Sequence, residues 1–235
     1  MIISHRHKFI YLRTEKTGSQ ALKRALRTAL EAAGEDPLGE MQTALSRKIP
    51  LRIGGLRHHA PRLVGLHSHA AARQVRDFVG AEVFESYFKF AVERNPWDRQ
   101  VSLYNHRSAK RRQSDLSGFD AAIRSPLYNA LHHNRLSNWN IYAIGDTVVA
   151  DQVLTYDRLQ QDLPALLDRI GLPDLEIPRR NTHGAPRPHY STYYSNQSRD
   201  IVGRWYRREI EQFGFEFDDR RPAGQDQTAP SIQTT

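Results

Sequence analysis

The chain contains no cysteine among its 235 residues. This absence excludes a disulfide scaffold, a thiolate nucleophile and every zinc or iron–sulfur site that needs cysteine ligands. The sequence also lacks an apolar run of the roughly 18–20 residues that a membrane-spanning helix needs. No apolar stretch typical of a secretory leader follows the basic segment at residues 5–8. We therefore expect a cytoplasmic protein without a membrane span.

Acidic residues are fewer than basic ones, and lysine is scarce among the basic ones. The chain has 34 Lys and Arg against 26 Asp and Glu, a formal net charge of +8. Most of the basic residues are arginines, whose planar guanidinium matches phosphate, sulfate and carboxylate groups in a bidentate manner. The charge is compatible with an anionic ligand, an anionic substrate or a nucleic acid. The codon usage of a GC-rich genome explains the arginine bias equally well.

Nothing in the composition indicates wholesale disorder. The hydrophobic fraction is 39% and the charged fraction 26%, which are ordinary values for a globular protein. A chain of this length buries about 70% of its unfolded surface, so a sizeable core is possible without metal or disulfide links. We expect one domain over residues 1–217. The polar, Pro- and Gly-containing residues 218–235 are predicted to be a disordered tail.

Short apolar runs alternate with helical patterns along the chain. Strands are predicted at residues 8–13, 63–66, 87–92 and 148–156. Helices are predicted at residues 21–34, 70–79, from 96 onward, 159–171 and about 196–212. Residues 35–62 and 107–118 are interpreted as irregular connections. The alternation predicts an α/β fold with a mainly parallel sheet, in which ligands bind at the carboxyl ends of the strands.

The segment Glu15–Gln20 lies between the first predicted strand and the first predicted helix. Its small residues allow backbone N–H groups and the helix N-terminus to point at an oxyanion. Lys16 adds a positive charge, and the hydroxyls of Thr17 and Ser19 add donors. The segment is not a Walker A loop, because its lysine precedes the only glycine and no Gly-Lys-Ser/Thr run follows. Taken alone, it fits a turn with a solvated lysine at least as well.

A second polar segment begins where the strand at residues 87–92 ends. Arg94 follows this strand, and Pro96 suits the first position of a helix. Ser102 lies about two turns into that helix, so an arginine and a hydroxyl could hold one dianion between them. A capped helix start with a structural Arg–Asp pair is the alternative.

The segment His67-Ser68-His69 follows the predicted strand at residues 63–66. On an extended segment, alternation places both imidazoles on one side. The pair fits a metal site, although no third ligand is evident. It also fits structural histidines, or a general base, because an ordinary histidine pKa suits removal of a hydroxyl proton near pH 7.

Together these motifs resemble those of PAPS-dependent sulfotransferases, in particular the carbohydrate-type members that are similar to sulfotransferase family 2. PAPS is 3′-phosphoadenosine 5′-phosphosulfate. The turn at Lys16–Ser19 resembles the family's 5′-phosphosulfate loop, and Arg94–Pro96 with Ser102 resembles its 3′-phosphate loop. The resemblance continues at residues 154–159 and 206–215, so it covers about residues 7–217. The chain departs from many members at Glu15, where they have proline, and just after Gly18.

The resemblance implies a P-loop-like three-layer fold, with a central parallel sheet flanked by helices. It implies in-line transfer of the sulfuryl group from PAPS to an acceptor hydroxyl, with no metal ion. The residues that would bind PAPS are Lys16, Thr17, Gly18, Ser19, Gln20, Arg94 and Ser102. Lys16 would also stabilise the leaving oxygen. By the same resemblance His69 is the general base, with His67 as its neighbour.

Two other functions remain open at this point. A P-loop-type nucleotide or nucleoside kinase would have a similar fold but would depend on magnesium. A non-catalytic polyanion-binding protein is supported only by the net charge, and no nucleic-acid-binding motif accompanies it. We expect an acceptor that is an anionic carbohydrate and no nucleic acid partner. The oligomeric state cannot be predicted from the sequence.

Overall fold

The computed structural model describes residues 1–35, 67–109, 116–132, 136–176 and 188–222. The predicted strand at residues 63–66 lies outside these residues. The chain divides into two compact units. The first unit comprises Met1–Arg94 and Ser137–His183, and the second comprises Asn95–Leu136 and Gly184–Thr235.

The first unit contains a four-stranded sheet with the order β1-β2-β3-β6. Its strands are β1 (Ile2–Ser4), β2 (Phe9–Tyr11), β3 (Phe88–Glu93) and β6 (Gln152–Thr155). β2, β3 and β6 are parallel, whereas β1 pairs with β2 in an antiparallel manner at the edge. The predicted parallel sheet is therefore confirmed, and the short edge strand β1 adds to it.

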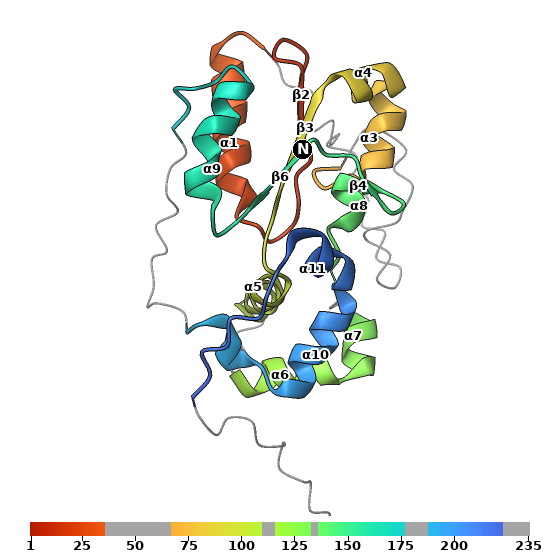
Figure 1. Cartoon of the computed structure of the whole chain (residues 1–235), viewed down its shortest axis with the longest axis vertical. Helices are drawn as coiled ribbons and strands as arrows, with labels where there is room; N and C mark the ends of the chain where they lie inside the picture. The colour runs from red at the N-terminus through yellow and green to blue at the C-terminus, as the bar shows by residue number, and fades with distance from the viewer. Residues whose placement is uncertain (36–66, 110–115, 133–135, 177–187, 223–235) are drawn as a thin grey trace, which may run out of the picture. The chain divides into compact units, whose positions relative to one another are not determined.

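Helices cover both faces of this sheet. In Figure 1, α1 (Ser19–Ala32) and α9 (Leu159–Arg169) lie along one side of the parallel strands, and α3 (Ala72–Val79) and α4 (Ala81–Ser86) lie along the other. The short helix α8 (Trp139–Tyr142) leads into a hairpin of β4 (Ala143–Ile144) and β5 (Thr147–Val148). The sheet of the first unit is thus flanked by helices, as the sequence predicts.

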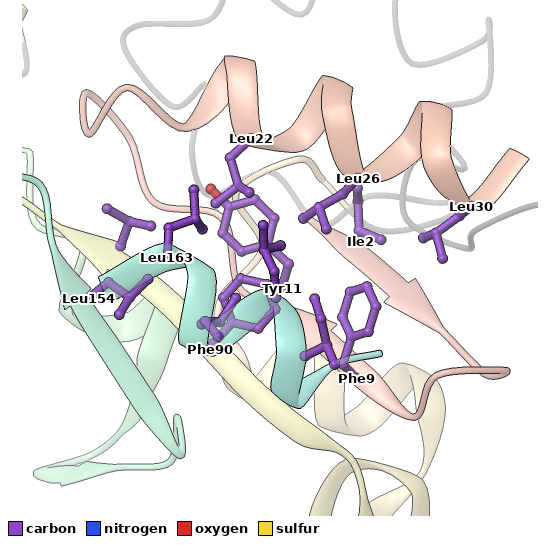
Figure 2. Close-up of a cluster of buried hydrophobic side chains, with 13 residues drawn as sticks. Ile2, Phe9, Tyr11, Leu22, Leu26, Leu30, Phe90, Leu154 and Leu163 are labelled. Atoms are coloured by element: carbon purple, nitrogen blue, oxygen red, sulfur yellow. The ribbon is translucent and has the colours of Figure 1, made fainter. Parts of the chain in front are cut away.

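The core of the first unit fixes α1 over the sheet. Leu22, Leu26 and Leu30 are four residues apart, so they share one face of the helix and are fully buried. Figure 2 shows this face turned toward Tyr11 and Phe90, whose rings stack with centroids 4.9 Å apart. Each buried leucine contributes about 1.5–3 kcal/mol relative to an exposed one. This packing determines where the N-terminus of α1 lies relative to the end of β2.

The second unit is largely helical. Its elements are α5 (Pro96–Ala109), α6 (Leu116–Arg124), α7 (Pro126–His132), the 3₁₀-helix η2 (Tyr190–Tyr193), α10 (Asn196–Trp205) and α11 (Arg207–Phe213). Its core is rich in aromatic rings and contains a buried ion pair, Arg99 with Glu209, at 3.6 Å. The Arg99 guanidinium also lies 4.6 Å from the ring centroid of Tyr206. This buried pair joins α5 to α11.

Two predicted elements are each divided in the structure. The strand predicted at residues 148–156 is two strands, because the Val149 and Ala150 amides donate to the Tyr142 carbonyl and turn the chain away from the hairpin. The helix predicted at residues 196–212 breaks at Tyr206, between α10 and α11. The Tyr206 hydroxyl accepts from the Leu136 amide and donates to the Gln100 side chain, so buried tertiary bonds hold this residue.

The connection predicted at residues 107–118 is shorter than expected. α5 continues to Ala109 and α6 begins at Leu116, and residues 110–115 lie outside the described part of the chain. His106 and Arg107 occupy the last turn of α5, where positive charge interacts favourably with the helix dipole. The basic residues that suggested a loop are therefore compatible with the end of a helix.

Candidate active site

Three connections meet at the carboxyl edge of the parallel sheet. β2 leads into the turn before α1, β3 leads into Arg94, and β6 leads into Tyr156. The ladder extends past the strand ends, because the Leu12 amide donates to the Phe90 carbonyl at 2.8 Å and the Tyr156 amide donates to the Glu93 carbonyl at 2.7 Å. This edge is the usual ligand site of an open α/β sheet.

The turn before α1 has an unusual backbone. Lys16 has φ of 62° and Gly18 has φ of 70°, so two residues out of three are left-handed. Gly18 is the N-cap of α1, no side chain caps the helix, and its first turn holds no acidic residue. Uncapped N–H groups and the positive end of the helix dipole therefore face the turn, which is the environment that binds an anion.

The hydroxyls of this turn are used internally. The Thr14 hydroxyl donates to the Val92 carbonyl, so the Thr17 hydroxyl, 2.8 Å away, is the donor to Thr14. The Ser19 hydroxyl donates to the Thr14 carbonyl at 2.9 Å. Each hydroxyl has one hydrogen, so the expectation that Thr17 and Ser19 offer hydroxyl donors to an anion is not met in this conformation. Their hydroxyls brace the turn, and the backbone supplies the donors.

Asn138 holds the start of the turn from another part of the chain. Its side chain accepts from the Glu15 amide at 2.9 Å and donates to the Glu15 carbonyl at 3.1 Å. The side-chain amide of Asn138 also donates to the buried Glu93 carboxylate. This carboxylate accepts a second bond, from the backbone amide of Arg94 at 2.8 Å. Sequence reasoning missed Asn138, because no local pattern connects it with a turn more than a hundred residues earlier.

Arg94 joins the two predicted anion-binding segments. Its guanidinium donates to the Lys16 carbonyl at 3.3 Å and lies 4.5 Å from the ring centroid of Tyr156. Tyr156 is 39% exposed and also packs against Gly18. Lys16 and Arg94 therefore lie at the same turn, and their assignment to the 5′-phosphosulfate and the 3′-phosphate of one nucleotide stays a prediction. Tyr156 shapes this turn and was not predicted from the sequence as a site residue.

Gly18→Ala is expected to lower the stability of the protein by more than the strain of its positive φ alone would. A Cβ at residue 18 would lie 2.6 Å from a ring carbon of Tyr156, and the left-handed φ costs about 1–2 kcal/mol for an alanine. Gly34→Ala is a matched control, since Gly34 has φ of 78° and a Cβ added there would meet no atom within 4 Å. Thermal denaturation should show a larger loss for Gly18→Ala, and an equal loss in both variants would contradict the contact with Tyr156.

The two histidines lie in a turn at residues 67–69, not on an extended strand. Their ring centroids are 5.4 Å apart, and the His69 amide donates to Nδ1 of His67 at 3.0 Å. Nδ1 of His69 lies 2.9 Å from the carbonyl oxygen of Arg13, in the segment between β2 and the turn. The Arg13 guanidinium in turn bonds to the hydroxyls of Ser68 and Ser19. These bonds tie the histidine turn to the start of α1.

The contact with Arg13 determines the tautomer of His69. A carbonyl oxygen only accepts, so Nδ1 of His69 carries the hydrogen and Nε2 carries the lone pair. Burial, followed by the positive charge of Arg13, lowers the pKa of His69 from 6.5 to about 3. His69 is therefore neutral near pH 7, with a lone pair available on Nε2.

We expect the His69 ring to stay neutral while the pH is lowered from 8 to 5. The folded-state pKa lies below the ordinary value, so protonation is deferred to a more acidic pH. Nitrogen and proton NMR of the imidazole, with His69→Asn used to assign the signals, would show the Nδ1–H form and no titration in this range. A titration midpoint near pH 6.5 would contradict the effect of burial and of Arg13 on the His69 pKa.

Ser102 lies in α5 of the second unit and is partly buried. The start of this helix is capped, because the Trp97 amide donates to the Asn95 side chain at 3.1 Å. The predicted roles of Ser102 in binding a phosphate and of Gln20 in binding the phosphosulfate remain predictions.

Comparison with known proteins gives the family. A model described as the sulfotransferase family matches residues 1–216. The chain belongs to the sulfotransferase family. The resemblance carried by the motifs is thereby confirmed, and membership supports sulfotransfer in general.

Other comparisons add little to this assignment. The chain is 30% identical over 115 residues to an uncharacterized protein of Archaeoglobus fulgidus, a match that covers 47% of this chain and 90% of that protein. No solved structure matches this member of the sulfotransferase family, so the implied P-loop-like fold remains a prediction. Within the described residues, no helix has both the length and the apolar character needed to cross a membrane.

Proposed function

We propose that the protein transfers the sulfuryl group of PAPS to an acceptor hydroxyl, with an anionic carbohydrate as the acceptor. The observation that carries this proposal is the contact of Arg94 with the Lys16 carbonyl, at the uncapped N-terminus of α1. It brings two cationic residues and a set of backbone donors to one turn, in a chain of the sulfotransferase family.

The residues of the turn fit the phosphosulfate end of this donor. Left-handed residues 16 and 18 curve the backbone, and a side chain at Gly18 would meet Tyr156, so the turn is shaped for a small residue. The backbone N–H groups at the start of α1 would bind this anion together with the Lys16 ammonium, and the Arg94 guanidinium beside the turn would bind the 3′-phosphate of the same nucleotide. The donor itself supplies a sulfuryl group attached to a phosphate leaving group.

The charges of the turn also suit the reaction. Negative charge grows on the leaving oxygen, and fixed donors aimed at it stabilise the transition state without rearranging. Lys16 is the residue that we assign to this oxygen. The helix dipole of α1 adds to the same effect. The bonds from Asn138 to Glu15 hold the backbone of the turn, so the donors are already oriented.

His69 is the residue to which we assign the acceptor proton. Its Nδ1–H is held by the Arg13 carbonyl, so the ring orientation is fixed and Nε2 is the basic atom. The low pKa keeps Nε2 unprotonated at neutral pH. A bound anion nearby raises a histidine pKa, and this shift would make His69 a stronger base when substrate is present.

A transfer assay tests this function. The purified chain would be incubated with PAPS labelled in the sulfate, a uronic-acid-containing oligosaccharide and EDTA. Label is expected in the oligosaccharide, because the fixed cations and N–H groups of the turn take the place of a magnesium ion. Absence of transfer to this and to other hydroxyl acceptors, or transfer only with added magnesium, would contradict the proposal.

A further inference from the structure

A pocket of about 550 Å³ lies on the second unit, formed by the first turn of α5, by α10 and α11, and by residues 217–219. Its volume is within the range of about 300–1,000 Å³ that is usual for small-molecule sites. None of its lining residues is among those assigned above to PAPS binding or to the general base. Its chemistry comes from two aromatic rings and a set of arginines.

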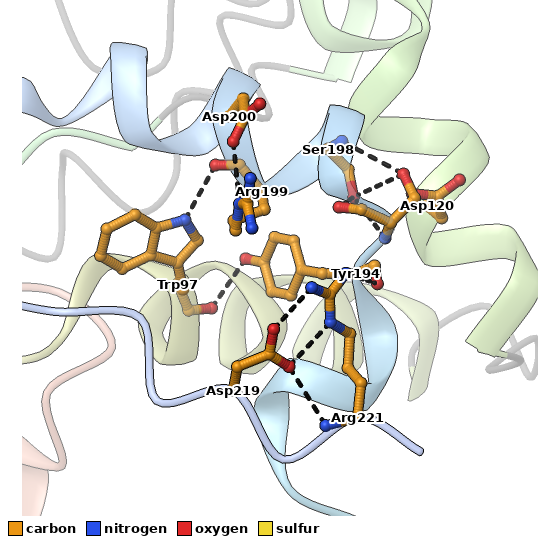
Figure 3. Close-up of polar contacts among 9 residues, drawn as sticks. Trp97, Asp120, Tyr194, Ser198, Arg199, Asp200, Asp219 and Arg221 are labelled. Atoms are coloured by element: carbon orange, nitrogen blue, oxygen red, sulfur yellow. Dashed lines mark hydrogen bonds and ion pairs between the residues drawn. The ribbon is translucent and has the colours of Figure 1, made fainter. Parts of the chain in front are cut away.

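The aromatic part of the pocket is formed by Trp97 and Phe217. Their ring centroids are 5.6 Å apart with planes at 77°. The indole N–H of Trp97 donates to the Arg199 carbonyl at 2.9 Å, as Figure 3 shows, and the residue is 7% exposed, so only a small part of the indole reaches the pocket. Gly203 of α10 adds no side chain here, and a Cβ at this position would lie 3.4 Å from the indole ring. The space beside Trp97 therefore depends on this glycine.

The wall that contains Phe217 is anchored to the rest of the second unit. The Asp218 amide donates to the Tyr190 hydroxyl at 2.7 Å, and the Arg220 amide donates to the Ser191 hydroxyl at 3.0 Å. The Phe217 ring also makes edge contacts with two tyrosines, one in η2 and one directly after it. The wall of the pocket that contains Phe217 is therefore held in place by specific contacts.

The charged groups of the pocket are nearly all paired, with one exception. The pairs are Arg199 with Asp200 at 2.8 Å, Arg207 with Glu211 at 2.6 Å, and Asp219 with Arg221 at 2.6 Å. Figure 3 shows the first and the last of these pairs. Arg204 lines the pocket and is exposed. Among the described residues it makes no hydrogen bond or ion pair, so its guanidinium is available to an anion.

We propose that this pocket binds a ring-shaped ligand that carries a single sulfate or carboxylate group. The ring would lie against Trp97 and Phe217, where it removes apolar surface from water. The anionic group would bind the guanidinium fork of Arg204. A sulfated sugar and an aryl sulfate share this chemistry. The proposal uses no residue of the turn at α1 and does not rest on the sulfotransfer chemistry proposed there.

Calorimetric titration of the full chain tests the proposal with four probes. N-acetylglucosamine 6-sulfate and 4-nitrophenyl sulfate carry both features, uncharged N-acetylglucosamine carries only the ring, and inorganic sulfate carries only the anion. We expect at least one of the ring sulfates to bind about tenfold more tightly, or better, than both single-feature probes. The preferred ring sulfate identifies the ligand class. The proposal would be overturned if inorganic sulfate bound as tightly as the ring sulfates, or if neither ring sulfate bound at millimolar concentration.

Three variants place the binding in this pocket. Arg204→Ala should lower the affinity for the ring sulfate by about tenfold or more. Gly203→Gln should abolish binding, because its side chain fills the space beside Trp97 without changing the charge. Arg208→Ala, an exposed arginine outside the pocket lining, is the matched control and should bind as the unmodified chain does. Arg94→Ala should also retain this binding, since Arg94 belongs to the other site. Unchanged affinity in folded Arg204→Ala and Gly203→Gln would overturn the assignment.

Discussion

Replacing His69 by alanine is expected to lower turnover by about 10²–10⁴-fold, the usual contribution of a general base. The lone pair on Nε2 is lost, while the backbone donors of the turn and Arg94 remain. Binding of the product nucleotide 3′,5′-bisphosphoadenosine should therefore change little. Single-turnover transfer from labelled PAPS and calorimetry with the product nucleotide would measure the two effects separately.

His69→Asn separates a catalytic role from a structural one. An asparagine can place an amide nitrogen where Nδ1 stands and donate to the Arg13 carbonyl, but it offers no base at the position of Nε2. It should fold like the unmodified chain and lose as much turnover as His69→Ala. Full turnover in both variants would move the base role elsewhere. His67 is then the first candidate, because its ring lies 5.4 Å away.

Replacing Arg94 by alanine is expected to lower the affinity for 3′,5′-bisphosphoadenosine by about 30-fold or more. Removal of one partner from a hydrogen-bonded charge pair costs about 2–5 kcal/mol, and each 1.4 kcal/mol is about a tenfold change. The loss has two sources, since Arg94 would bind the anion directly and also bonds to the Lys16 carbonyl. Calorimetry of the folded variant would measure it.

Two further variants make this experiment specific. Arg94→Lys keeps the positive charge and loses the fork, so its affinity should fall between those of the unmodified chain and Arg94→Ala. Arg158→Ala removes an exposed arginine that pairs with Asp162 on α9, and it should leave the affinity unchanged. Equal losses in Arg158→Ala and Arg94→Ala would indicate a general effect of net charge and no defined site.

Many of the helices and strands follow from local patterns. The leucines of α1 recur every four residues, and Gly34 follows the end of the helix as expected. Pro96 begins α5 at the predicted position, because its fixed φ suits the first turn of a helix. The separation into two units and the break at Tyr206 were not predicted. Both depend on contacts between distant residues, which leave no periodic pattern in the sequence.

The site could be predicted in part for a related reason. Lys16 and Arg94 each follow a strand, and strands that run parallel bring such residues to one edge. The internal use of the Thr17 and Ser19 hydroxyls could not be predicted, since it depends on the Thr14 carbonyl and hydroxyl in three dimensions. The bond from His69 to the Arg13 carbonyl likewise joins residues 56 positions apart.

Calorimetric titration of the unmodified chain with 3′,5′-bisphosphoadenosine, in the presence of EDTA, tests the central claim most directly. If the turn before α1 and Arg94 form a site for the PAPS nucleotide, this ligand should bind without a metal ion. ATP under the same conditions should bind about tenfold more weakly or worse. No binding of bisphosphoadenosine, or tighter binding of ATP that requires magnesium, would contradict the account.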